Sequence, residues 1–198
     1  MHGVGTAVDS RHLHVLRVLV VRSFLDRVLK ALITQLPRRL RDWIASSVLP
    51  GLFLPDRVVL KQYKFDWEAF FGQEKANYDR LQNLQGGVIP ILYGETKLEG
   101  SPTLILSEVV GVMPYEQTAP LLSVCELRLR VSVALQQFND LGLAYNAIHL
   151  GHIILVDDGV VLVDMRQVCS VGPEDWESVF EADRAHVEDA YSRFLECR

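Results

Sequence analysis

The feature that most constrains the fold is a β-hairpin signal in the last third of the chain. Two apolar, β-branched runs, residues 152–156 and 160–163, flank the turn sequence Asp157-Asp158-Gly159. An Asp-Gly turn between two such runs is a strong sequence signal for an antiparallel hairpin. The second run ends at Asp164. The sequence therefore predicts a hairpin that Asp164 closes.

The rest of the chain alternates strand patterns with helix patterns. Short β-rich runs bounded by turn residues predict strands at residues 57–63, 88–93 and 102–107. Apolar side chains at helical spacing predict helices at residues 67–84, 121–141 and 173–197. The last two strands are separated by a polar turn that contains glycine. These elements predict an α+β fold with a small antiparallel sheet.

The first 50 residues differ from the rest of the chain in charge. They carry eight Lys/Arg and three Asp/Glu, a net charge of +5, whereas residues 51–198 carry a net charge of −10. An apolar stripe over residues 13–36 predicts a helix that stops before Pro37. We therefore expect a basic helical N-terminal extension over residues 1–50, followed by one domain over residues 51–198.

This basic helix leaves two interpretations open. Charged residues interrupt it too often for a membrane span, which needs about 20 predominantly apolar residues, and no cleavage site follows a clean apolar run. One interpretation is a helix packed on the acidic body. The other is an interfacial or mitochondrial-targeting helix, because the segment is basic and poor in acids. Arg38, Arg39 and Arg41 form a small basic cluster ahead of Trp43.

Composition narrows the classes of partner and compartment. Hydrophobic residues make up 49% of the chain and charged residues 23%, which are globular proportions that exclude disordered and collagen-like proteins. The acidic body lacks the clustered Lys and Arg that phosphate contacts need, so we expect no nucleic-acid partner. Three scattered cysteines predict a reducing compartment. Without an export signal or a transmembrane segment, we expect a cytoplasmic protein.

Four segments occur in a characteristic order along the chain. They are LPDRVVLKQYK, FGQEKANYDRLQNLQGGVIPILYGE, SPTLILSEVVG and VVLVDM. In this order and register they resemble the protein-kinase-like fold, in particular the fungal kinase-like proteins. The resemblance covers a little over half of the chain, residues 55–168. It implies a small antiparallel N-lobe sheet with one helix, followed by a truncated, mostly helical C-lobe.

The resemblance implies roles for residues at matching positions. Lys61 would contact the phosphates of ATP and pair with Glu74. The alternative is that both residues are ordinary surface charges. Residues 106–111 match the strand-to-hinge segment whose backbone receives an adenine, which places Glu108 and Val110 at the nucleotide. Asp164 matches the aspartate that holds Mg²⁺, although it could also serve only to cap the hairpin.

The catalytic loop departs from the family's pattern. Counting back from the hairpin places Tyr145 at the histidine position, Ala147 at the catalytic aspartate position and His152 at the metal-binding asparagine position. Alanine cannot accept a proton, and loss of a general base typically costs roughly 10² to 10⁴ in rate. No GxGxxG loop precedes Lys61. We therefore expect binding of ATP and Mg²⁺ to be weak or absent.

Two further clusters of polar residues could carry chemistry. His149 and His152, with Asp164 expected nearby, suggest a transition-metal site, but the spacing is not diagnostic and no third ligand is identifiable from the sequence. Asp157 and Asp158 are candidates for a substitute base, but turn chemistry explains both. Neither cluster changes the functional hypothesis.

The sequence leaves three hypotheses about function. The first is a pseudokinase, a binding or regulatory module for an unknown protein partner, with residual ATP affinity through Lys61, Glu74 and Asp164. The second is a divergent but active ATP-dependent phosphotransferase in which positioning alone suffices. The third is a truncated kinase-like remnant, which the short C-lobe favours. We favour the pseudokinase because Ala147 argues against catalysis.

Overall fold

The structure is a computed structural model that describes residues 2–7, 14–44, 50–63, 66–146, 148–172 and 174–197. These residues form an α+β protein, which confirms the predicted class. They divide into two compact units. The first unit combines residues 1–66 with residues 92–108, and the second combines residues 67–91 with residues 109–198. No helix within the described ranges is long and apolar enough to cross a membrane.

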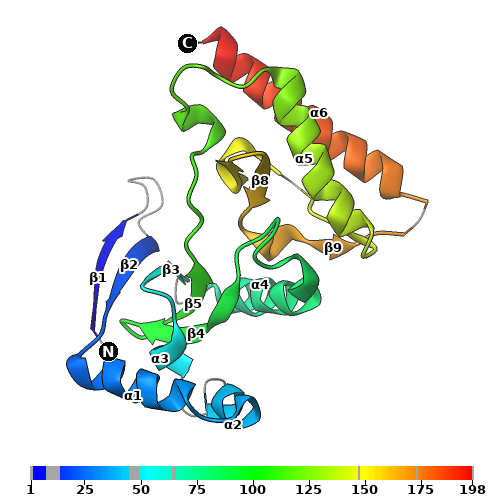
Figure 1. The fold of residues 1–198 in the computed structure, drawn as a ribbon. Helices are drawn as coiled ribbons and strands as arrows, with labels where there is room; N and C mark the ends of the chain where they lie inside the picture. The colour runs from blue at the N-terminus through cyan, green and yellow to red at the C-terminus, as the bar shows by residue number, and fades with distance from the viewer. Residues whose placement is uncertain are drawn as a thin grey trace. The chain divides into compact units, whose positions relative to one another are not determined.

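A five-stranded antiparallel sheet organises the described part of the first unit (Figure 1). In spatial order its strands are β1 (His2–Ala7), β2 (Val15–Val21), β3 (Arg57–Gln62), β5 (Ser101–Ser107) and β4 (Leu92–Leu98). The central strand β3 carries Lys61, which lies opposite Val15 of β2 and Leu104 of β5. The β-branched residues of these runs favour the extended backbone.

The single helix predicted over residues 13–36 is wrong in its first part. Residues Val15–Val21 form a strand, and helix α1 (Phe24–Thr34) begins only after Ser23. From Arg17 to Val21 more exposed and less exposed side chains alternate with the period of two that a strand requires. Strand β2 pairs with β3, so residues on both sides of the predicted boundary near residue 50 lie in one sheet.

The predicted strand at residues 88–93 also needs correction. Strand β4 begins at Leu92 and continues to Leu98, through most of the turn that was expected after residue 94. The chain instead reverses at Glu99 and Gly100, which have φ values of 52° and 83°. These left-handed values suit a tight reversal, and glycine adopts them without steric cost.

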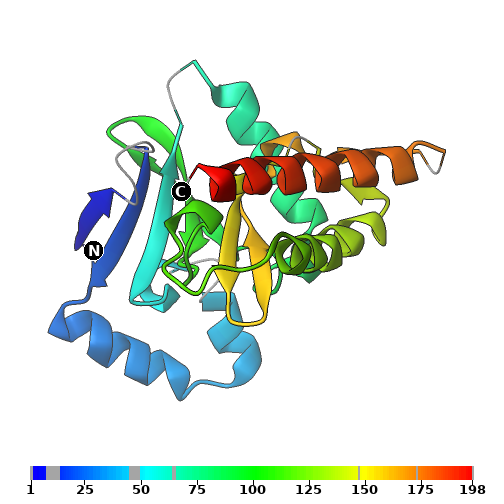
Figure 2. The same cartoon turned by 90° about the horizontal axis from the view of Figure 1, so that it is seen from above.

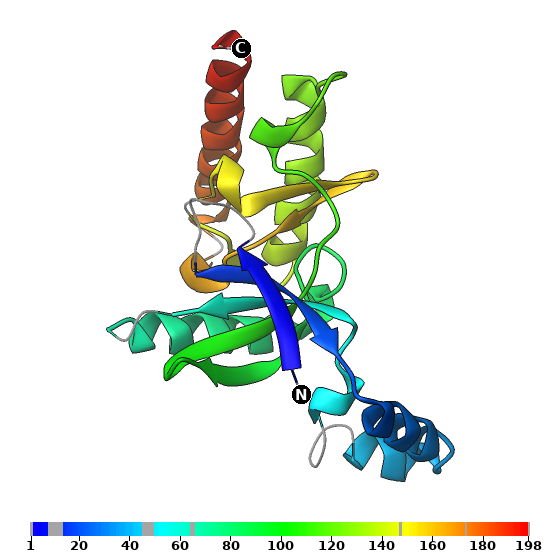
Figure 3. The same ribbon diagram turned by 90° about the vertical axis from the view of Figure 1, so that its left-hand side faces the viewer.

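Two short helices follow α1 in the first unit, α2 (Arg38–Trp43) and α3 (Pro50–Phe53) (Figure 3). Helix α1 packs against α3, where Ile33 and Leu52 are both buried. The ammonium nitrogen of Lys30 lies 5.9 Å from the centroid of the Phe53 ring. The side of α1 that carries Lys30 and Ile33 is therefore its packed side.

The second unit contains the long helices α4 (Glu68–Arg80), α5 (Val124–Asn139) and α6 (Trp176–Glu196), close to the ranges predicted. The predicted hairpin is confirmed as β7 (Ile153–Val156) and β8 (Gly159–Leu162), paired from Ile153 opposite Leu162 to Val156 opposite Gly159 (Figure 2). The described part of the second unit also contains two short strands and four 3₁₀ helices (η): β6 (Leu143–Ala144), β9 (Cys169–Ser170), η2 (Gln82–Leu84), η3 (Pro114–Glu116), η4 (Leu150–His152) and η5 (Met165–Gln167).

Helix α5 forms the centre of the second unit's core. Its inner face is buried along its whole length, as the sequence predicts, at Leu127, Val131, Ala134, Leu135 and Phe138. It packs against α6 and against strand β8. The hydroxyl of Ser123 caps its first turn by accepting a hydrogen bond from the Glu126 N–H. The contact between α5 and β8 therefore positions the hairpin and the aspartate that follows it.

Candidate functional site

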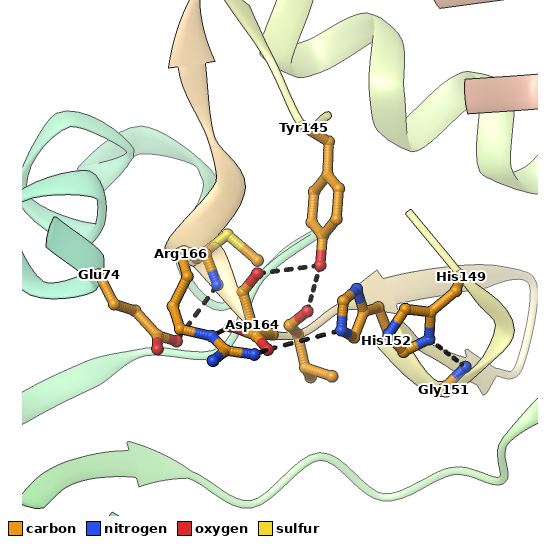
Figure 4. Close-up of polar contacts among 9 residues, drawn as sticks. Glu74, Tyr145, His149, Gly151, His152, Asp164 and Arg166 are labelled. Atoms are coloured by element: carbon orange, nitrogen blue, oxygen red, sulfur yellow. Dashed lines mark hydrogen bonds and ion pairs between the residues drawn. The ribbon is translucent and has the colours of Figure 1, made fainter. Parts of the chain in front are cut away.

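Four predicted site residues of the second unit lie close together where the chain leaves the hairpin: Glu74, Tyr145, His152 and Asp164 (Figure 4). Asp164 has a left-handed backbone (φ 73°, ψ 76°) and leads into η5. This conformation is uncommon for a residue with a Cβ, and it persists where the surroundings fix it. The Tyr145 hydroxyl supplies one restraint, because it contacts the carbonyl oxygens of Val163 and Asp164, the latter at 3.0 Å.

The carboxylate of Asp164 is held by basic side chains. Arg166 donates to both of its oxygens, from Nε at 2.6 Å and from a terminal nitrogen at 2.5 Å. His152 Nε2 lies 3.5 Å from the same carboxylate. A bidentate guanidinium contact of this kind is among the strongest hydrogen-bonded ion pairs in proteins. The hydrogen bond to Asp164 raises the pKa of Arg166, so the guanidinium stays charged.

These residues do not fit a Mg²⁺ site. Mg²⁺ prefers oxygen ligands in octahedral geometry, but both oxygens of Asp164 already accept hydrogen bonds from Arg166. His152 also lies beside this carboxylate, and imidazole nitrogen suits transition metals better than Mg²⁺. Among the residues that the structure describes, no three His, Cys, Asp or Glu side chains form a group that could hold a metal ion.

The two histidines that precede the hairpin contact each other, and one of them accepts a backbone hydrogen bond. The His149 and His152 rings contact each other with their centroids 3.4 Å apart and their planes tilted by 37°. His149 Nδ1 accepts a hydrogen bond from the Gly151 N–H at 3.1 Å, which caps η4. The transition-metal alternative for His149, His152 and Asp164 therefore has no support in the described residues.

Helix α4 holds the other side of the Asp164 loop. Glu74 is fully buried, and its carboxylate accepts a hydrogen bond from the Met165 N–H at 3.2 Å. One turn later, the Asn77 side-chain amide donates to the carbonyl oxygens of Met165 at 2.8 Å and Val168 at 3.0 Å. The structure thus brings Glu74 and Asp164 into one network. Sequence reasoning predicted both residues but not the Arg166 and Asn77 contacts.

The predicted partner of Glu74 belongs to the first unit. Lys61 is buried on strand β3, with its ammonium nitrogen 5.7 Å from the centroid of the Tyr63 ring. Because Glu74 belongs to the second unit, the Lys61–Glu74 pair stays a prediction. Lys61 does lie on the third strand of the chain, at the centre of the sheet.

The two predicted hinge residues have different surroundings. Glu108 uses its carboxylate within the first unit, 2.6 Å from Arg17 Nε and 4.0 Å from an Arg57 nitrogen. Val110, in the second unit, is 82% exposed. Neither side chain therefore reports on an adenine contact, which would use the backbone. The adenine-binding role of this segment stays a prediction.

The segment around Ala147, which the sequence resemblance aligned with a catalytic loop, is anchored by a residue that sequence reasoning missed. Ala147 lies outside the described residues, but its neighbours Asn146 and Ile148 donate their N–H groups to the Asp183 carboxylate, at 3.1 and 3.4 Å. Asp183 is a buried residue of α6. A signal for it exists in the sequence, because it shares the inner face of that helix with Val187, and a carboxylate on an apolar face indicates a buried acceptor.

Two buried tyrosines border this network. Burial raises the pKa of Tyr145 and of Tyr78 well above 10, and the nearby carboxylates of Asp164 and Glu74 raise both further. Both hydroxyls therefore stay neutral at physiological pH. They differ in their contacts, since Tyr145 has two carbonyl partners, whereas the Tyr78 hydroxyl has no hydrogen-bond partner among the described residues.

Comparison with known proteins does not assign this chain to a family. No protein-family model matches the sequence, and no curated protein matches it significantly. The kinase-like relationship is therefore a proposal that rests on the four sequence segments and on the geometry around Asp164.

Proposed function

We propose that this chain is a pseudokinase, a kinase-like protein that acts as a binding or regulatory module for a protein partner and does not transfer phosphate. The observation that carries the proposal is the bidentate contact of Arg166 with Asp164. In a protein kinase the aspartate at this position holds Mg²⁺ against the phosphates of ATP. Here a guanidinium of the same loop takes up that carboxylate.

The order of elements supports the kinase-like part of the proposal. In protein kinases the lysine that contacts the nucleotide lies on the third strand, and its glutamate partner lies on the helix that follows. Lys61 lies on β3, and Glu74 lies on α4, the next helix of the chain. The hairpin β7–β8 then leads to Asp164, as the metal-binding aspartate requires.

The chemistry of the loop supports the non-catalytic part. Phosphoryl transfer depends on positioning and on metal ions that neutralise the phosphate charge. Asp164 is already neutralised by Arg166, and Ala147 at the predicted base position carries only a methyl group. Tyr145, at the predicted histidine position, stays neutral and is used to hold the backbone of Asp164. We expect residual ATP affinity at most.

A phosphoryl-transfer assay tests this proposal. The purified chain is incubated with Mg-ATP labelled on the γ-phosphate, and released phosphate, labelling of the chain and labelling of casein as a general substrate are measured. The Asp164→Ala variant, purified in parallel, corrects for contaminating kinases. We expect no difference between the two proteins. Turnover that Asp164→Ala abolishes would overturn the proposal and favour the divergent phosphotransferase.

A second experiment tests the role given to Arg166. Replacing it with glutamine leaves the Asp164 carboxylate without its guanidinium, so binding of Mn²⁺, measured by electron paramagnetic resonance, should rise at least tenfold. The matched control is Arg193→Gln, which removes an arginine that is paired with an exposed aspartate, Asp189, on α6. Equal Mn²⁺ binding by the wild type and both variants would contradict the role proposed for Arg166.

A further inference from the structure

Helix α1 turns its apolar side chains toward solvent. Five large ones are between 39% and 76% exposed: Phe24, Leu25, Val28, Leu29 and Leu32. At about 100° per residue, these positions fall within an arc of about 140° on one side of the helix. Single exposed apolar residues are ordinary, but a contiguous set marks an interaction surface. We call these five residues the apolar arc of α1.

The opposite side of α1 is the one that packs against its own unit. Ile33 is buried there, and Lys30 lies against the Phe53 ring. Asp26, on the same side, caps the helix start together with Ser23. A surface helix normally buries its apolar stripe and exposes its polar one. Helix α1 does the reverse, so packing within the described unit does not account for its apolar arc.

The segment that carries the apolar arc is basic. Residues 22–44 carry six Lys/Arg and two Asp/Glu, a net charge of +4 in a chain whose net charge is −5. Arg27 on α1 and Arg39 on α2 are both exposed. Helix α2 also exposes Leu40 (45%) and Trp43 (57%). Exposed Phe, Leu and Trp side chains together with Arg and Lys are typical of helices that lie in a membrane interface.

We propose that α1 and α2 bind the surface of an anionic lipid bilayer, with the apolar arc of α1 at the boundary between headgroups and acyl chains. Charge decides between this partner and a second copy of the chain. A symmetric dimer through α1 would bring two positive segments together, whereas an anionic bilayer attracts each of them. At 11 residues, α1 is too short to cross a membrane, so it lies on the surface. This proposal does not depend on the proposed function.

Vesicle co-sedimentation of the full chain tests the proposal. Large unilamellar vesicles of phosphatidylcholine alone are compared with vesicles that contain 30% phosphatidylserine (about one lipid in three, enough for a clear negative surface potential). We expect at least tenfold tighter binding to the anionic vesicles. Raising the NaCl concentration from about 0.1 to about 0.5 M should weaken that binding, because salt screens the attraction.

Two double variants separate the apolar and the electrostatic contributions. Leu25→Gln with Leu32→Gln removes two side chains of the apolar arc and should lower affinity for anionic vesicles at least tenfold. Arg27→Gln with Arg39→Gln should lower it roughly 25-fold, at about fivefold per basic residue. The matched control is Leu129→Gln with Val133→Gln on α5, whose side chains are 59% and 58% exposed, and it should bind like the wild type.

Three results would overturn the proposal. The first is equal binding to neutral and anionic vesicles, and the second is an equal loss of binding in the α5 control. The third is the absence of vesicle binding. In that case analytical ultracentrifugation tests whether the chain forms a dimer through the apolar arc, which the Leu25→Gln, Leu32→Gln double variant would dissociate. Circular dichroism melting of every variant checks that each one is folded.

Discussion

The Asp164 loop and helix α1 both depart from the usual distribution of side chains, but in opposite directions. Around the loop, the carboxylates of Glu74 on α4 and Asp183 on α6 are buried, whereas α1 exposes leucine and phenylalanine. Each of those carboxylates accepts hydrogen bonds from backbone N–H groups of its own unit. Burying a charge without such partners is costly. The buried carboxylates thus have hydrogen-bond donors within their own unit, whereas the apolar arc of α1 stays exposed in the described part of its unit, which is why we propose an external partner for it.

The largest effect is expected at Asp183. Replacing it with alanine leaves the Asn146 and Ile148 N–H groups without their acceptor, so we expect the free energy of unfolding to fall by about 3 kcal/mol. Urea denaturation measures this change. Asp189→Ala, on the exposed side of the same helix, should change stability by no more than about 0.5 kcal/mol. Equal losses in the two variants would contradict the anchoring role of Asp183.

The two buried tyrosines should respond differently to the same substitution. Tyr145→Phe removes a hydroxyl that has two carbonyl partners and should cost about 1 to 2 kcal/mol. Tyr78→Phe removes a buried hydroxyl that has no hydrogen-bond partner among the described residues, so stability should stay the same or rise. Urea denaturation of the pair measures the difference. A larger loss for Tyr78→Phe would reverse the assignment.

The same tyrosines predict how stability changes at alkaline pH. Their pKa values are raised in the folded protein, while an unfolded tyrosine ionises at about pH 10. The unfolded chain therefore binds fewer protons above that pH, and stability falls as the pH rises. Each tyrosine should contribute about 1 kcal/mol of this loss between about pH 9 and pH 11. Denaturation of the Tyr78→Phe, Tyr145→Phe double variant should show a shallower decline than the wild type, and an unchanged decline would contradict the burial argument.

The smallest effect is expected on the apolar arc. Leu25 is 76% exposed, so Leu25→Gln should change the free energy of unfolding by no more than about 0.5 kcal/mol. Ile33→Ala, on the packed side of the same helix, should cost about 2 to 3 kcal/mol. Thermal denaturation compares the two variants. A large loss for Leu25→Gln would mean that the arc is part of the core.

Local patterns carried most of the correct predictions about the fold. The hairpin β7–β8 was predictable because its two β-branched runs and its Asp-Gly turn are contained in about a dozen neighbouring residues. The helix over residues 13–36 was misassigned because leucines of β2 and α1 fall by coincidence at helical spacing. The start of α1 was visible in the sequence, since Ser23 and Asp26 form a capping box.

The site was predicted less completely, because its contacts join distant segments. Glu74 and Asp164 were identified from motif positions, but Asp183 contacts Asn146 and Ile148 from a helix that begins about 30 residues after them. The contact between Arg166 and Asp164 forms at a residue with a left-handed backbone, which no local pattern indicates. Such contacts follow from tertiary packing and not from periodicity.

The most direct test of the central claim is thermal denaturation with ATP, in the presence of Mg²⁺ and in the presence of EDTA. A ligand that binds only the folded state raises the melting temperature. At millimolar ATP, a Kd near 0.1 mM would raise the free energy of unfolding by roughly 1 to 2 kcal/mol. Because Arg166 holds the Asp164 carboxylate, we predict that any shift is the same with and without Mg²⁺. A shift that requires Mg²⁺ and is lost in Asp164→Asn would contradict the account.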